Sequence, residues 1–220
     1  MKRLLLFFFT IPAFCESLHY AINWPSGLSL GEATLEATHT GEKSSAQWTL
    51  SLSIDASIPG FAVRDDDKST ATAELCSIEF DKTFAHGQHR NQETLKFDQQ
   101  THQVMRQTAG GGKSEISVGA CARDPLAFIQ YLRRELAEGR LPPQQQVVYG
   151  AAYDVRVEYK GKQSIRVGEQ NVEAERIAAT IKGPSSNLNV EIFFAQDAVR
   201  TPLEAKIPLA LGTFSLELQR

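Results

Sequence analysis

The sequence lacks the short motifs by which many enzymes are recognised. It contains no G-x-S-x-G nucleophile elbow, no H-E-x-x-H helix, no C-x-x-C pair and no G-x-G-x-x-G dinucleotide fingerprint. These motifs carry a serine nucleophile, zinc ligands, a redox pair and a pyrophosphate cradle. We therefore expect no catalytic site, no metal and no cofactor, and we predict that the protein is not an enzyme.

Charge of either sign is not in excess. The 220 residues include 23 basic and 26 acidic ones, which gives a net charge of −3. A basic excess would point to nucleic acid, and a strong acidic excess would point to a disordered tail. Hydrophobic residues make up 42% of the chain, as in folded globular proteins. The composition predicts one folded domain and no nucleic-acid partner.

Cysteine is scarce, with three residues in the whole chain. Cys15 belongs to the N-terminal leader described below, which leaves Cys76 and Cys121. An even pair in an oxidising compartment predicts one disulfide. Two buried free thiols are the alternative, and a catalytic thiol is disfavoured because no histidine partner is organised nearby.

The N-terminus has the three parts of a secretory signal peptide. Two basic residues precede the apolar run 4–11, and small residues favour a cut after Cys15. A cut after Ser17 fits nearly as well. We predict a cleaved signal peptide, residues 1–15, and a single β-rich domain, residues 16–220, that is periplasmic or secreted.

Lipid anchoring and a membrane span are both disfavoured. A bacterial lipoprotein would carry its lipid on Cys15, but that processing site needs a small residue where the bulky Phe14 stands. After the leader, no run reaches the roughly 18 apolar residues that a membrane-spanning helix requires. We therefore expect no transmembrane segment.

Apolar and polar side chains alternate through most of the remaining chain. The clearest alternating segments are 48–55, 154–160, 188–194 and 214–218. Weaker alternation marks 20–24, 33–37, 78–80, 95–97, 177–181 and 205–211. Such segments predict strands that bury one face and expose the other, as antiparallel sheets do. The predicted fold is mainly β, a curled antiparallel sheet or a partly closed barrel.

One helix interrupts the strands, at about residues 125–138. Asp124 is a candidate N-cap, Pro125 suits the first helical position, and Gly139 suits the end. Apolar residues recur at three- and four-residue steps, so the helix should present one apolar stripe. We expect it to pack against the sheet, with a Cys76–Cys121 bridge holding its N-terminal end.

Two polar segments could bind a metal ion. His86-Gly87-Gln88-His89 lies near Asp81 and Glu93, but its spacing matches no known zinc signature. Asp65-Asp66-Asp67 lacks the alternating acids, glycine and final glutamate of a calcium loop. We interpret the first as a turn between two strands and the second as a solvated turn or a helix cap.

Glycines, arginines and one aspartate complete the candidates. Gly110-Gly111-Gly112-Lys113 lacks the spacing of a phosphate-binding loop and predicts a hairpin. Asp197 should accept hydrogen bonds from backbone amides of a tight connection, and Arg200 should pair locally. Four arginines lie on or beside the helix: Arg123, Arg133, Arg134 and Arg140. They could bind an anion, but dipole complementation and surface ion pairs with Glu135 and Glu138 are favoured.

The chain resembles the bacterial secreted family catalogued as domain of unknown function 3108. The matching stretches are 18–24, 31–35, 93–98, the helix start 124–126, and 193–218 with Asp197, Arg200, Thr201-Pro202-Leu203 and 212–218. The Cys76/Cys121 pair and a longer segment, 140–149, depart from the family pattern. The resemblance implies an exported, β-rich envelope protein with no assigned reaction, and it supplies no catalytic residues.

Three functions follow from this outline. The first is a non-enzymatic envelope protein whose sheet and helix form an apolar groove for a lipid or another apolar small molecule. The second is a structural or assembly partner of a periplasmic or outer-membrane complex. The third and least favoured is an envelope hydrolase, which would need polar residues that converge in a cleft. The residues to inspect for such a cleft are His86, His89, Asp65, Asp124, Asp197 and Arg200.

Overall fold

The computed structural model describes residues 14–41, 46–58, 61–184, 186–209 and 212–219. The strands are β1 (Phe14–Asn23), β2 (Ser29–Thr40), β3 (Gln47–Ile58), β4 (Phe61–Thr72), β5 (Ser77–His86), β6 (His89–Asp98), β7 (Gln103–Thr108), β8 (Lys113–Ser117), β9 (Gln145–Val148), β10 (Ala152–Val167), β11 (Gln170–Lys182), β12 (Asn187–Ala195), β13 (Pro202–Leu209) and β14 (Gly212–Leu218). The helix is α1 (Pro125–Ala137). Residues 1–13, and with them most of the predicted signal peptide, lie outside the described residues.

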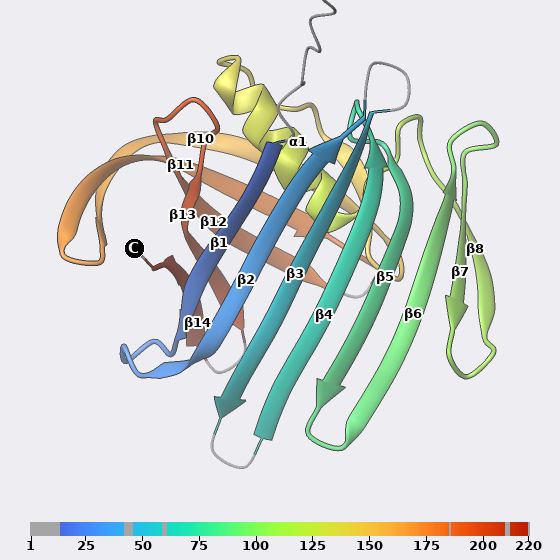
Figure 1. Ribbon diagram of the computed structural model, residues 1–220, viewed down its shortest axis with the longest axis horizontal. Coiled ribbons are helices and arrows are strands. Elements are labelled where there is room, and N and C mark those ends of the chain that lie inside the picture. The colour runs from blue at the N-terminus through green and yellow to red at the C-terminus, as the bar shows by residue number, and fades with distance from the viewer. Residues whose placement is uncertain (1–13, 42–45, 59–60, 185, 210–211, 220) are drawn as a thin grey trace, which may run out of the picture.

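All described strands belong to one antiparallel sheet. Its order is β8-β7-β6-β5-β4-β3-β2-β1-β14-β13-β12-β11-β10-β9, so β8 and β9 form its two ends and the sheet is not closed. The sheet curls so that β1 to β6 face β10 to β13, and α1 lies across one open end between them (Figure 1). The predicted fold class, a curled antiparallel sheet with one helix packed against it, is confirmed. Among the described residues, no helix is long and apolar enough to cross a membrane.

The alternating segments coincide with strands, except that Trp24 follows the end of β1 and residues 210–211 lie outside the described residues. β4 is one of the strands that alternation did not predict. Its central residues are Asp65, Asp66 and Asp67, which pair with Ile54, Ser53 and Leu52 of β3. The prediction of a solvated turn or helix cap was therefore wrong. Strands are held together by backbone hydrogen bonds, and β4 pairs with β3 on one side and β5 on the other. This pairing forms the strand although two of its inward positions are carboxylates.

Part of the space inside the curl is filled by the protein itself. The β10–β11 hairpin has a register shift between Tyr159 and Lys162, and across it the buried positions of β11 change from the odd residues Ile177 and Ala179 to the even residue Ala174. Beyond the shift, Ile165 and Val167 are buried in one cluster with residues of β1, β2 and β14. The end of this long, curved hairpin (Figure 1) therefore forms part of the core.

Helix α1 begins and ends as its sequence predicts. The Asp124 carboxylate accepts hydrogen bonds from the backbone N–H groups of Leu126 and Ala127 at 2.8 and 3.0 Å. Pro125 occupies the first turn, and Gly139 has φ +73°, the left-handed conformation that ends many helices. The helix buries an apolar stripe against the inner face of the sheet.

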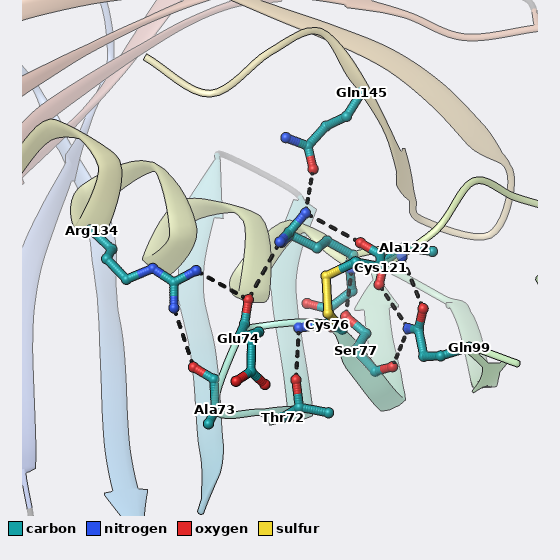
Figure 2. The surroundings of a disulfide bond; sticks show 12 residues. Thr72, Ala73, Glu74, Cys76, Ser77, Gln99, Cys121, Ala122, Arg134 and Gln145 are labelled. Carbon is teal, nitrogen blue, oxygen red and sulfur yellow. Dashed lines mark hydrogen bonds between the residues drawn. A yellow bond between two sulfur atoms is a disulfide. The ribbon is translucent and has the colours of Figure 1, made fainter. Parts of the chain in front are cut away.

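Cys76 and Cys121 form the predicted disulfide, which joins the β4–β5 turn to the segment before α1. Hydrogen bonds surround it (Figure 2). The Gln99 side chain donates to the carbonyls of Ser77 and Ala122 at 2.6 and 3.0 Å, and its oxygen accepts from Ala122 N–H. The disulfide and these bonds hold the start of α1 against the sheet.

Arginines extend the same network. Arg134 donates to the carbonyls of Ala73 and Glu74 at 3.2 and 3.3 Å (Figure 2). Arg123 donates to the side chain of Gln145 at 2.7 Å. Arg123 also stacks on the ring of Tyr131, at 3.8 Å from its centroid. These two arginines therefore connect the β4–β5 turn, α1 and β9.

Arg133 departs from the surface role that we predicted for the helix arginines. Its side chain is 2% exposed and forms a bidentate ion pair with Glu16 of β1, at 2.6 and 2.9 Å. Its Nε also donates to the carbonyls of Val199 and Arg200. The prediction does hold for Arg140, which pairs with Glu135 and Glu138. No pattern in the sequence links Glu16 to Arg133, which lies 117 residues further along the chain.

We expect Glu16→Ala to lower the free energy of unfolding by about 3 kcal/mol, because it leaves the Arg133 guanidinium buried without its counter-charge. Glu32→Ala, on the exposed face of β2, is the matched control and should cost less than about 0.5 kcal/mol. The double variant Glu16→Leu/Arg133→Met should recover much of the loss. Urea unfolding measures all three, and an unchanged midpoint for Glu16→Ala would contradict the assignment.

Candidate functional site

An apolar cavity of about 390 Å³ lies between α1 and the strands β9 to β12. Its walls include Phe128 and Ile129 of α1, Ala179 of β11 and Ile192 of β12. Two tyrosines and one serine bring the only hydroxyl groups to this lining, and all other lining side chains are hydrocarbon. The volume falls within the range of small-molecule sites. The cavity can therefore take up an apolar group, and its lining offers little to orient a polar one.

A charged cluster lies on the inner face of β4 to β7. It contains three carboxylates and two cations: Asp65, Asp67, Lys82, Glu93 and Arg106. Two of the carboxylates have close partners. Asp65 is 2.7 Å from Nε2 of His86, and Glu93 receives two hydrogen bonds from Arg106 at 3.0 and 2.7 Å.

Asp67 and Lys82 are cross-strand neighbours without such partners. Asp67 is 7% exposed, and its buried Oδ1 accepts no hydrogen bond from the described residues. Lys82 lies opposite it on β5 and forms no ion pair within the described ranges. Its Nζ instead lies 3.9 Å from the ring centroid of Tyr149 and 5.4 Å from that of Phe84.

The turn between β9 and β10 joins the cluster to the cavity. Tyr149 in this turn lines the cavity and contacts Lys82. Gly150 has φ +74°, and a Cβ on it would come within 3.1 Å of Oε2 of Glu93. Glycine is therefore required by both the backbone conformation and the close approach of the turn to β6.

Burial raises the pKa of Asp67 to about 7, with Lys82 opposing the shift and Asp65, Asp124 and Asp66 adding to it. Burial also raises the pKa of Tyr149 above its ordinary value, and Asp67 is the charge that contributes most. Asp67 is held in an environment that disfavours its charged form.

The structure brings together some of the residues that the sequence analysis singled out. Asp65 and His86 contact each other, and His89 pairs with His86 across the β5–β6 turn, which confirms that segment as a turn. Asp124 is fully buried as the N-cap of α1 and also accepts hydrogen bonds from Ser69 and Ser77 at 2.6 and 2.5 Å. Its role is structural.

The other two residues lie at the β12–β13 connection. Asp197 accepts hydrogen bonds from the backbone N–H and the hydroxyl of Thr201 at 3.0 and 2.6 Å, as expected for a brace of this turn. Arg200 pairs with Glu175 of β11 at 3.3 Å rather than with a residue of its own turn. Within the described ranges, no three His, Cys, Asp or Glu side chains group as a metal site would require.

Sequence reasoning missed Asp67, Lys82 and Tyr149 as a group. Asp67 was noted only within an acidic run, whereas Lys82 and Tyr149 carried no motif. A signal is present in β4, because Asp65 and Asp67 continue the two-residue steps that run from Val63 to Ser69, and all four residues therefore share the inner face. That reading requires knowing that β4 is a strand.

Comparisons with known proteins identify the family and the fold. The family model described as "Protein of unknown function (DUF3108)" matches residues 17–219, which confirms the resemblance seen in the sequence. No curated protein matches the chain. A solved structure described as a β-barrel-like protein of domain of unknown function DUF1849, from Brucella abortus, has a TM-score of 0.64 at 6% identity. The alignment covers 93% of this chain and 95% of that one, and at this identity it shows a shared fold alone.

We expect Asp67→Asn to stabilise the protein at pH 8 by about 1–3 kcal/mol and to have little effect near pH 4. The folded-state pKa of Asp67 lies above the unfolded value, so its contribution to stability is greatest at low pH and is lost as the pH rises through about 7. Urea unfolding of the wild type and the variant at both pH values measures the difference. Asp66→Asn, on the opposite face, should show no such trend, and a destabilised Asp67→Asn at pH 8 would contradict the prediction.

Proposed function

This chain belongs to the family described as "Protein of unknown function (DUF3108)", and we propose that it is a non-enzymatic envelope protein that binds a lipid or another apolar small molecule. The observation that carries the proposal is the cavity of about 390 Å³ beneath α1. Its lining is almost entirely hydrocarbon, so burial of an apolar ligand there would be favourable.

The walls of the cavity support this role because they are held in place. The disulfide and Asp124 attach the start of α1 to β4 and β5. Glu16 of β1 forms an ion pair with Arg133 in the middle of α1. A wall that is already ordered loses little conformational freedom when a ligand binds.

We propose that the protein acts in the periplasm or is secreted. The disulfide is consistent with an oxidising compartment. Of the two cuts that the leader allows, the cut after Cys15 keeps Glu16, whereas the cut after Ser17 removes it and leaves Arg133 without its ion pair. The contact of Glu16 therefore favours a mature chain that begins no later than Glu16.

Absence of catalysis is also part of the proposal. Its support is the arrangement of the six polar candidates: Asp65, His86 and His89 lie on β4 to β6, Asp124 caps α1, and Asp197 and Arg200 lie at another turn. Asp124 and Asp197 accept hydrogen bonds from backbone N–H groups, and Arg200 forms an ion pair with Glu175. These contacts account for the positions of the three side chains. An envelope hydrolase would need these groups to converge around one substrate.

A second candidate function is assembly with an envelope protein. The observation that favours it is the outer edge of β8: among the described strands β8 pairs with β7 alone, and its side chains are mostly exposed. A free strand edge can accept another strand through backbone hydrogen bonds. A photoreactive residue at position 115 of β8, tested in cells, should capture a partner if this edge is used, and no capture would count against it.

The mature N-terminus tests the proposed processing. Protein recovered from the periplasm or the medium should begin at Glu16, or earlier, by intact mass measurement, because the fold uses the Glu16 carboxylate. A mature chain that begins at Leu18 would contradict the proposal.

Filling the cavity tests the proposed binding. We expect Ala179→Phe to weaken binding of the apolar dye N-phenyl-1-naphthylamine about tenfold, since Ala179 faces the cavity. Ala178→Phe is the matched control: it lies next in β11 on the other face, opposite Glu191 and Glu158, and should bind the dye like the wild type. Native mass spectrometry of protein purified from its own compartment should also show a bound apolar molecule. Equal dye binding by both variants would overturn the assignment of the site.

A further inference from the structure

We propose that Asp67 and Lys82 form the polar end of the cavity beneath α1 and bind a zwitterionic head group, so that the ligand is an amphiphile carrying an ammonium and a phosphate. This inference rests on the proposed function, since it assumes that an apolar chain occupies the cavity. It adds the chemistry of the head group.

The first support is an unsatisfied buried carboxylate. Asp67 is more than nine-tenths buried, and its Oδ1 accepts no hydrogen bond from the described residues. Buried carboxylate oxygens nearly always have a donor. An ammonium group from a ligand would supply one, with a charge of the matching sign.

The second support is the unpaired cation beside it. Lys82 faces Asp67 across β4 and β5, yet within the described ranges its Nζ is held only over the rings of Tyr149 and Phe84. The other two acids of the cluster offer Lys82 no free carboxylate, because Asp65 is engaged by His86 and Glu93 by Arg106. A phosphate oxygen would give Lys82 a charged acceptor.

The third support is the position of Tyr149. Its side chain lines the cavity, and Lys82 lies against its ring. Lys82 is therefore separated from the apolar space by a single side chain, and Asp67 lies opposite Lys82 on β4. A ligand with its chain in the cavity would meet this pair at the Tyr149 end.

The sign of the charges selects the head group. A single positive or negative head near both Asp67 and Lys82 is attracted by one and repelled by the other, so the two effects largely cancel. A head that carries both signs can place its ammonium toward Asp67 and its phosphate toward Lys82, and it gains from both. An uncharged hydroxyl could donate to one and accept from the other, but with weaker bonds.

The test uses four probes with the same twelve-carbon chain, each below its micelle concentration. They are dodecylphosphoethanolamine, dodecyl phosphate, dodecylamine and dodecanol, which carry a zwitterionic, anionic, cationic and neutral head. Displacement of N-phenyl-1-naphthylamine from delipidated wild-type protein should show the zwitterion binding about tenfold or more tightly than each of the others.

Variants test whether Asp67 and Lys82 cause the preference for the zwitterionic probe. Asp67→Asn and Lys82→Met should each remove the preference, and each should weaken the binding of dodecanol much less than that of the zwitterion, because a hydroxyl forms the weaker bonds. Asp66→Asn and Lys68→Met are matched controls on the outer face of β4 and should keep it. Circular dichroism and melting check that each variant is folded, and the wild-type comparison of the four probes tests the inference if a variant does not fold.

The outcomes separate the two proposals. Equal binding of the four probes, a preference for one of the singly charged heads, or a zwitterion preference that survives both inner-face variants would overturn the head-group inference while leaving apolar binding in place. Failure of all four probes and of the dye to bind would overturn the proposed function and the inference together.

Discussion

The structure depends on covering the inner face of a single antiparallel sheet. A sheet of fourteen strands has a far larger apolar face than one helix of 13 residues can cover. Curling brings the two halves of the sheet toward each other, and the β10–β11 hairpin fills part of the enclosed space with Ile165 and Val167. Beneath α1, neither the curling of the sheet nor the hairpin fills the space completely, and a cavity remains. The candidate site is thus a consequence of how the sheet is covered.

Long-range contacts hold the helix over this space. The disulfide fixes the segment before α1, Asp124 joins its first turn to Ser69 and Ser77, and Arg133 pairs with Glu16. Buried ion pairs give little net stability compared with apolar packing, but breaking one is costly. Their effect here is to define one position for α1, and a fixed helix gives the cavity a fixed wall.

The inward charges of β4 to β7 break the rule that a sheet buries apolar side chains. Where sequence and burial disagree in a folded protein, a functional site is the usual explanation. Asp65 and Glu93 have partners that explain their burial, whereas Asp67 and Lys82 do not. Lys82 of this pair contacts Tyr149, which lines the cavity, and this contact is the basis of our proposal that the ligand has a polar group as well as an apolar chain.

The sequence by itself determined the strands with regular alternation, the limits of α1, the disulfide and the family. Each of these depends on local pattern, on residue spacing or on an even pair of cysteines, all of which can be read along the chain. The strand nature of β4, the partner of Arg133 and the contact of Lys82 with Tyr149 were decided only by the tertiary structure. Strand order and the curl of the sheet set those contacts, which join residues far apart in sequence, and no local pattern encodes which distant side chain will lie opposite a buried charge.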